Sequence, residues 1–303
     1  MARFAFPLLL MGAVVLGWSA IFTRFSEVGP IATGFYRMVL ALPVFLAWAV
    51  IDDRRTAGDP PKGMPKTRRD VYLLILSGVF FAGDLTAWHW SIKLTTVGNA
   101  TLFGNSSPVF VAIAAFVLFG ERVTRLFLGG LLLAMVGAAV LMRESFSVSP
   151  ETFLGDILGV ITGMFYAGYI LTVARVRQRV STGATMAIGG LTAAILLAIG
   201  AALTEDQLIP ITLNGWLWLF ALAYICQLGG QSLLIMSLAY LPASFGAVAL
   251  LVQPIITSLL GWWLLAEAIT VEKALGMMTI LAGIWLARRG TPQAVQGTAQ
   301  NAQ

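Results

Sequence analysis

Long apolar stretches recur along almost the whole chain, and they restrict its fold more than any other feature. Each stretch holds about 20 residues, the length at which an α-helix crosses the ~30 Å hydrocarbon core of a bilayer. A chain that is 58% hydrophobic and 11% charged is also unlike a soluble domain. We therefore predict an all-α integral membrane protein with ten transmembrane helices, at residues 5–24, 30–51, 71–92, 98–119, 124–142, 152–174, 183–203, 214–237, 243–265 and 270–288.

The positive charges lie mostly on one side of these predicted spans. With the N-terminus in the cytoplasm, fourteen of the nineteen Lys and Arg residues fall in cytoplasmic segments, four fall outside, and Arg37 lies within a span. Cytoplasmic loops carry such an excess, so both termini are predicted to be cytoplasmic. The net charge of +5 is then a sign of topology, and we predict no nucleic-acid partner. A flexible cytoplasmic loop is predicted at 52–70 and a disordered tail at 290–303.

The chain contains a faint internal repeat. Residues 98–143 align without a gap on residues 244–289, at a shift of 146, with seven of 46 positions identical. We therefore predict two five-helix halves, at 1–145 and 146–289. Because five spans per half is an odd number, the second half is predicted to be inverted relative to the first. Inverted repeats are typical of carriers that open a central site to one face at a time, although such duplications also occur in some channels.

Two Glu and two Thr residues recur at equivalent positions of the repeat, just before its last predicted helices. They are Glu121 and Thr124 in the first half, and Glu267 and Thr270 in the second. A Thr at the N-cap accepts a hydrogen bond from a free backbone N–H, and an acid near a helix N-terminus interacts favourably with the positive end of the helix dipole. We interpret all four residues as helix caps.

Two repeated prolines, Pro108 and Pro254, each interrupt a predicted span near its middle. A proline removes one helix hydrogen bond and leaves a carbonyl free, which lipid tolerates only where that carbonyl faces protein or a water-filled cavity. Asn105 and Ser107 precede the first proline, and Gln253 precedes the second. These polar neighbours favour a cavity over a simple kink, so we predict helix breaks that face a binding site.

The segments SIKLTTVGNATLFGNSSPVFVAIAAFVLFGERVT (91–124) and MSLAYLPASFGAVALLVQPIITSLLGWWLLAEAIT (236–270) resemble the drug/metabolite transporter superfamily, in particular its ten-helix EamA-type members. Each segment has a small-residue helix entry, a mid-helix Pro and a Glu that closes the span, and Arg37 also looks like the family pattern. The resemblance covers about residues 5–289. It implies two five-helix halves around a central cavity lined mainly by spans 1, 3, 4, 6, 8 and 9. Within the superfamily, the aromatic interior and short loops are most similar to bacterial exporters of aromatic amino acids.

Polar and aromatic side chains within the spans recur at helical spacing and predict the walls of a central pocket. Polar groups in hydrocarbon need partners, so such faces are expected to point inward. Hydrogen bonding between helices, with no ligand, is the alternative interpretation. The predicted substrate-binding residues are Trp18, Phe22, Asp84, Asn105, Ser107, Tyr166, Tyr169, Tyr224, Gln227, Gln231 and Gln253.

Arg37 and Asp84 are charges predicted to lie at similar depth within their spans. A charge there costs about 3 kcal/mol or more unless it is partnered, so we predict an ion pair between them. The pair is either a permanent brace, or a site at which Arg37 receives a substrate carboxylate and Asp84 an ammonium group or a coupling proton. His89, the only histidine, lies near the outer end of its span and is either an interfacial residue or a proton-coupling group.

We therefore predict a secondary transporter of the bacterial inner membrane that exports small organic metabolites by alternating access. Aromatic amino acids are the first expected substrates, cationic or amphipathic drugs and other metabolites are the alternative, and a channel is a further one. No enzyme activity or cofactor is predicted, because the sequence shows no clustered catalytic groups such as paired aspartates or a His/Cys/Glu constellation. No metal is predicted either, because one His and one Cys cannot supply a transition-metal site. The expected partners are the substrate and the lipid bilayer, with proton coupling left open, in a monomer or weak dimer.

Overall fold

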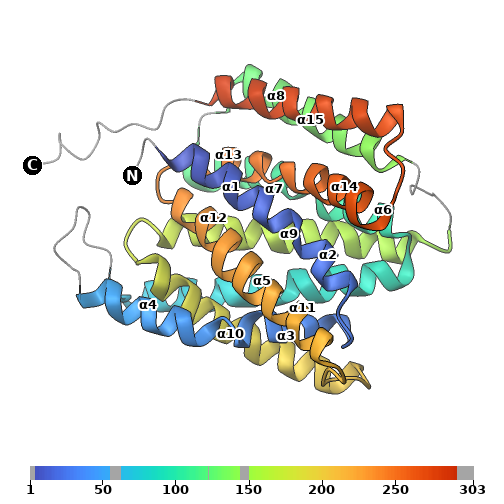
Figure 1. Cartoon of the computed structure of the whole chain (residues 1–303). Helices are drawn as coiled ribbons and strands as arrows, with labels where there is room; N and C mark the ends of the chain where they lie inside the picture. The colour runs from blue at the N-terminus through green and yellow to red at the C-terminus, as the bar shows by residue number, and fades with distance from the viewer. Residues whose placement is uncertain (1–3, 55–62, 122, 144–149, 292–303) are drawn as a thin grey trace, which may run out of the picture.

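The computed structural model describes all residues except 1–3, 55–62, 122, 144–149 and 292–303. Most of the predicted tail and the middle of the predicted loop at 52–70 lie outside this part. The described chain is helical, apart from one isolated β-bridge between Gly63 and Val180. The helices stack in a bundle (Figure 1). They are α1 (Ala5–Gly17), α2 (Ser19–Arg24), α3 (Pro30–Val39), α4 (Leu42–Arg54), α5 (Arg68–Leu94), α6 (Val97–Gly104), α7 (Ser107–Phe119), α8 (Arg125–Leu141), α9 (Phe153–Val176), α10 (Thr182–Thr204), α11 (Leu213–Ala221), the π-helix η3 (Leu222–Gln231), α12 (Ser232–Ser237), α13 (Ala243–Ala249), α14 (Val252–Leu265) and α15 (Val271–Gly290).

The prediction of an all-helical, largely apolar membrane fold is confirmed. Within the described residues, eight stretches are long and apolar enough to cross a membrane: Ala5–Arg24, Pro30–Arg54, Arg68–Leu94, Asn99–Leu118, Phe153–Val176, Thr182–Thr204, Leu213–Ser237 and Ala243–Leu265. The other two predicted spans are also helical, but α8 is a shorter apolar helix and α15 carries charges in its first and last turns. The count of ten spans therefore remains a prediction.

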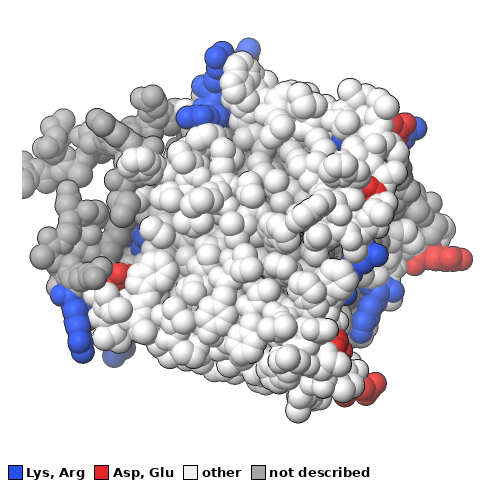
Figure 2. All heavy atoms as spheres, in the orientation of Figure 1, with Lys and Arg blue, Asp and Glu red and all other residues white. Residues whose placement is uncertain are grey.

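The surface of the bundle is consistent with a lipid surrounding. Figure 2 shows a broad face without Lys, Arg, Asp or Glu, with the charged groups gathered toward its edges. Large apolar side chains are exposed on many helices, including Phe116 at 60%, Leu132 at 64% and Trp263 at 67%. Soluble monomers rarely expose contiguous apolar surface of this kind, so lipid is the environment that fits it.

Both spans that contain a repeated proline are divided into two helices. Pro108 is the second residue of α7, and Pro254 is the third residue of α14. A proline is tolerated in the first turn of a helix, because the N–H groups there have no partner within the helix. The prolines thus stand at helix starts, immediately after the breaks that separate α6 from α7 and α13 from α14.

Local structure repeats at the same shift as the sequence. Gly120 and Ala266, 146 residues apart, each end a helix in the left-handed conformation, with φ of 64° and 55°. Thr124 and Thr270 are both N-caps, since their hydroxyl oxygens accept hydrogen bonds from Phe127 N at 3.1 Å and from Lys273 N at 3.3 Å. The two stretches therefore share the same turn chemistry as well as the same residues.

Helices α8 and α15 pack side by side along one edge of the bundle (Figure 1), with glycines at their contact. A Cβ atom at Gly130 would lie 2.7 Å from the carbonyl oxygen of Gly283, and one at Gly137 would lie 2.9 Å from that of Gly276. Such close backbone approach is possible only where neither helix carries a side chain at the contact. The start of α1 lies beside the end of α15, since the Arg288 guanidinium lies 3.7 Å from the centre of the Phe6 ring.

Candidate transport site

A buried arginine lies at the centre of the candidate site. Arg37 is on α3 and is 9% exposed. Its Nε donates to Gln227 Oε1 on η3 at 2.8 Å, one terminal nitrogen donates to Ser19 Oγ on α2 at 3.1 Å, and the guanidinium lies 5.6 Å from the centre of the Phe81 ring on α5. Three other helices, α2, α5 and η3, therefore contact this cation with neutral groups, and its positive charge is not cancelled by a contacting carboxylate.

Arg37 and Asp84 do not form the predicted ion pair at contact distance, although Arg37 still interacts electrostatically with the Asp84 carboxyl group. In the part of the chain that the structure describes, the ion pairs within 4.0 Å involve neither of these residues. Asp84 is also 9% exposed and lies on α5, one turn beyond Phe81. The prediction used depth in the membrane alone, and depth does not fix the direction in which a side chain leaves its helix. Arg37 instead donates a hydrogen bond to the amide oxygen of Gln227.

Two tyrosine rings on α9 and a second glutamine on η3 continue from Phe81, the ring that lies against this cation. Tyr169 OH accepts a hydrogen bond from Gln231 Nε2 at 2.9 Å, and its ring centre lies 4.8 Å from that of Phe81. Tyr166 stacks on Tyr169 at 5.9 Å. Sequence analysis selected both tyrosines and both glutamines, and the structure brings Gln227, Gln231 and Tyr169 into one buried cluster.

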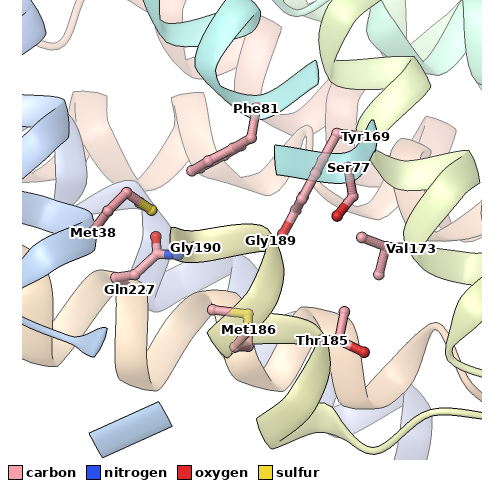
Figure 3. A pocket seen from close by; sticks show the side chains of 10 residues that line it. All are labelled: Met38, Ser77, Phe81, Tyr169, Val173, Thr185, Met186, Gly189, Gly190 and Gln227. Atoms are coloured by element: carbon pink, nitrogen blue, oxygen red, sulfur yellow. The ribbon is translucent and has the colours of Figure 1, made fainter. Parts of the chain in front are cut away.

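A small cavity adjoins this cluster (Figure 3). Its volume is about 10 Å³, roughly the room that one water molecule occupies. The central pocket predicted from the sequence is thus narrow in this conformation. The labelled side chains of Figure 3 surround it from α3, α5, α9, α10 and η3, and they are Met38, Ser77, Phe81, Tyr169, Val173, Thr185, Met186, Gly189, Gly190 and Gln227.

Tyr224 does not belong to this cluster, although its spacing placed it on one face with the two glutamines. It is 41% exposed, whereas Gln227 and Gln231 are 2% and 1% exposed. Residues 222–231 form a π-helix, in which hydrogen bonds run from residue i to i+5 and each turn holds more residues than in an α-helix. Residues three and seven apart therefore do not share a face here, and Tyr224 stacks on Phe220 at 6.0 Å instead.

Trp18 and Phe22 lie in an aromatic row beside the site. Their ring centres are 5.7 Å apart, and that of Phe22 lies 5.9 Å from that of Trp218 on α11. Trp18 stands at the break between α1 and α2 and directly precedes Ser19, which contacts Arg37. Because Trp18 and Ser19 are adjacent in the chain, the aromatic row and the arginine site meet at the break between α1 and α2.

The polar residues beside the prolines lie where the helix breaks pack against neighbouring helices. Asn105 Nδ2 donates to Thr101 O at 2.9 Å, within the same span. A Cβ atom at Gly163 of α9 would lie 3.2 Å from Ser107 N, and one at Gly17 would lie 3.2 Å from Gln253 O. Each break is thus packed against a glycine of a neighbouring helix, and no hydrogen bond of the described residues joins these polar groups to Arg37.

His89 is buried, at 5% exposure, and its Nδ1 has no hydrogen-bond partner in the described chain. Its ring centre lies 5.1 Å from that of Trp88. The histidine is on the same helix as Asp84, but among the described residues no hydrogen bond or ion pair joins it to Asp84 or to Arg37.

Neither predicted glutamate cap serves the helix that follows it. Glu121 accepts hydrogen bonds from Ala243 N at 3.2 Å and Ser244 Oγ at 2.6 Å, at the start of the distant helix α13. Glu267 accepts from Arg24 at 3.1 Å. These carboxylates connect segments far apart in the sequence, which spacing along one helix does not reveal.

Several site residues had no signal in the sequence. Ser19 follows Trp18 and looks like any small residue of a span, while Phe81 and the two methionines, Met38 and Met186, look like ordinary apolar positions. The GG pair at 189–190 is the feature that could have drawn attention to α10, because glycines in a helix interior often mark close approach or open space.

Comparison with known proteins agrees with this architecture. The family model described as "EamA-like transporter family" matches residues 3–143 and again residues 153–289. An "Uncharacterized transporter" of Archaeoglobus fulgidus is 28% identical over 287 residues, covering 92% of this chain and 96% of that protein. The "Pseudopaline exporter CntI" of Pseudomonas aeruginosa strain UCBPP-PA14 is 27% identical over 229 residues, covering 75% and 78%. A crystal structure at 18% identity has a TM-score of 0.81 and covers 95% of this chain and 98% of its own, which shows a shared fold.

Proposed function

Because the chain belongs to the EamA-like transporter family, we propose that it is a carrier that exports small organic metabolites bearing a carboxylate. The observation that carries this proposal is the buried Arg37, held by neutral partners. Its two recorded bonds use two of the five N–H groups of a guanidinium. A substrate carboxylate would meet the remaining donors and balance a charge that is otherwise costly within the membrane.

Aromatic amino acids are the substrates that we propose first. Phe81, Tyr166 and Tyr169 supply flat apolar surface beside Arg37, and aromatic rings stack favourably on such surface. Asp84 is the buried acid on the same helix as Phe81, and it would attract the ammonium group of the substrate. The relative named as a pseudopaline exporter supports export as the direction, and other metabolites or cationic drugs are the second candidate cargo.

We further propose that transport proceeds by alternating access between two inverted five-helix halves, in ten spans with both termini in the cytoplasm. The contacts of the glycines support a two-fold relation. Gly130 contacts Gly283, and Gly137 contacts Gly276. At the shift of 146, Gly130 becomes Gly276 and Gly137 becomes Gly283, so each contact maps onto the other. A two-fold axis between the halves would produce this exchange, and the double match of the family model agrees with it.

The test is uptake of labelled tryptophan or phenylalanine into proteoliposomes, with and without a pH gradient. We expect saturable uptake that is lost in Arg37→Gln and weakened in Trp18→Ala. Arg24→Gln is the matched control, because that arginine is exposed and pairs with Glu267 at the surface. Flat uptake beside active control carriers would remove the aromatic assignment, and equal uptake by wild type and Arg37→Gln would remove the arginine from the site.

A further inference from the structure

The two repeated glutamates have the same backbone surroundings but different partners. The N–H of Glu121 donates to Ala115 O at 3.1 Å, and that of Glu267 donates to Gly261 O at 3.2 Å. These two acceptors are equivalent at the shift of 146, and each glutamate directly follows a residue in the left-handed conformation. The two side chains therefore leave matching turns, so a difference between their partners reflects how the surrounding helices are arranged.

Glu121 joins the end of α7 to the start of α13. Its carboxylate accepts hydrogen bonds from Ala243 N at 3.2 Å and from Ser244 Oγ at 2.6 Å. At the shift of 146, the equivalents of Ala243 and Ser244 are Val97 and Gly98, the first two residues of α6. Backbone N–H groups in the first turn of a helix have no partner within that helix. The matching contact of the other glutamate would thus join the end of α14 to the start of α6.

That matching contact is not made in this conformation. Glu267 pairs instead with Arg24 at 3.1 Å, and both side chains are exposed. Exposed ion pairs contribute little to stability, so Arg24 does not prevent Glu267 from taking another partner. The helices differ in the same way, because α13 packs against α7, whereas α6 and α14 have no comparable contact among the described residues. Ala247 on α13 is accordingly buried, while the equivalent Thr101 on α6 is partly exposed.

The two contacts belong to opposite ends of the bundle. Helix α13 lies toward the end with the N-terminus and α6 toward the other end (Figure 1). In the proposed topology, the Glu121 end is cytoplasmic and the Glu267 end is outer. The helices are thus joined at the first end and not at the second. Two inverted halves that exchange conformations would reverse this difference.

We propose that Glu121 and Glu267 are gating residues that form their contacts alternately during transport. In the present conformation, Glu121 holds α7 on α13 and closes the cytoplasmic end. In the opposite conformation, Glu121 releases α13, and Glu267 leaves Arg24 to accept hydrogen bonds from the N–H groups of Val97 and Gly98. This assignment rests on the proposed alternating access between two inverted halves, and it adds the residues that hold each end closed.

The two contacts differ in one chemical group. Ser244 donates a hydroxyl to Glu121, whereas the equivalent Gly98 has no side chain that could donate to Glu267. A hydrogen bond to a carboxylate is stronger than one between neutral groups. Because the Glu121 contact has this additional bond, we expect the conformation described here to be the more populated one in the absence of substrate.

The first experiment measures a distance across the outer end while both glutamates stay in place. Spin labels are attached to Leu94→Cys, just before α6, and to Trp263→Cys on α14, in a Cys226→Ser background; both labelled positions are exposed. Pulsed electron paramagnetic resonance of the protein in bilayer discs, without substrate, should give a major long distance and a minor short one. Weakening bonds to one carboxylate changes such an equilibrium by about fivefold. We therefore expect Glu121→Gln to raise the ratio of short to long distances by about fivefold, and Glu267→Gln to lower it.

Further variants separate gating from a purely structural role. Ser244→Ala removes one bond to Glu121, and Gly98→Ser supplies the missing hydroxyl to the other contact, so both should raise the short-distance fraction. Glu272→Gln is the matched control, because Glu272 is exposed and pairs with Arg143 at the surface. This control should leave the ratio unchanged. A merely structural Glu121 would change the melting temperature without moving the distances.

The opposite signs expected for the two glutamates make the proposal refutable. A single distance in all variants, or a change in the same direction for Glu121→Gln and Glu267→Gln, would overturn the alternation. Since the distances are measured without substrate, reciprocal shifts in a protein that takes up no amino acid would retain the gating pair and remove only the substrate assignment. Saturable amino-acid uptake with unmoved distances would retain the carrier and remove the gating pair.

Discussion

The packing of α8 against α15 permits a sharp test with two neighbouring glycines. In Gly130→Ala, the new Cβ would lie 2.3 Å from Ala287 N and 2.7 Å from Gly283 O. In Gly129→Ala, on the same turn, the new Cβ would meet Leu286 Cδ2 at 3.8 Å, an ordinary van der Waals contact. Both changes raise helix propensity by about the same amount, roughly 1 kcal/mol. The difference between the two variants therefore isolates the clash.

Backbone atoms at such distances yield only if the helices separate, which is overpacking of a tight interface and costs about 1–3 kcal/mol. Relative to Gly129→Ala, we expect Gly130→Ala to have a lower free energy of unfolding by this amount, or a Tm lower by about 2–10 °C. Gly283→Ala should behave like Gly130→Ala, because its Cβ would lie 2.4 Å from Ala134 N. Since Gly130 and Gly283 share one contact, the double variant should cost less than the two single variants added together.

The assay is thermal unfolding of the purified protein in detergent, followed by tryptophan fluorescence, for wild type and the four variants. Gly129→Ala should unfold at or above the wild-type temperature. If Gly130→Ala is as stable as Gly129→Ala, the two helices do not approach as closely as described, and the reasoning from the glycine contacts is refuted.

Three carboxylates give further predictions. Glu205→Gln weakens the two bonds that the carboxylate accepts from the first turn of α3, at 2.7 and 2.8 Å, and should lower the free energy of unfolding by about 1–3 kcal/mol in thermal denaturation. Hydrogen bonds from Thr212 lower the pKa of Glu27 below its usual 4.5. The contribution of Glu27 to the free energy of unfolding is therefore present above pH 4.5 and is lost as the pH falls through the lowered pKa. Thr212→Val should weaken this loss of stability at acid pH when unfolding is measured against pH. Glu121→Gln should lower stability by about 1 kcal/mol, since it weakens the bonds from Ser244 and the start of α13, and unchanged melting would contradict it.

Local chemistry accounts for what sequence analysis predicted well. Runs of about 20 apolar residues have few alternatives to a membrane helix, because every backbone polar group in lipid must be satisfied within the segment. Pro108 and Pro254 interrupt hydrogen bonding wherever they occur, and Thr124 caps the turn that follows it whatever lies around it. Each of these features depends on residues within a few positions of one another, so one sequence contains the information.

Contacts between distant segments were predicted less well. The Glu121 carboxylate reaches a helix 122 residues away, and Arg37 bonds to Gln227 at a separation of 190 residues. Depth in the membrane limits the possible partners of Arg37 to polar groups at the same depth, but it does not choose among several such groups. The choice among them depends on the rotation of each helix about its axis, which is set by packing against its neighbours.

The π-helix at 222–231 shows how a local deviation decides which residues reach the site. If this segment were α-helical, Tyr224 would point the same way as Gln227 and Gln231, and a third polar group would compete for space beside Arg37. The wider turn places Tyr224 outward, at 41% exposure, and leaves the two glutamines buried, one on the arginine and one on Tyr169. π-helical turns often occur at functional sites, and here the wider turn directs two amides, from consecutive turns, at the arginine and the tyrosine that form the proposed site.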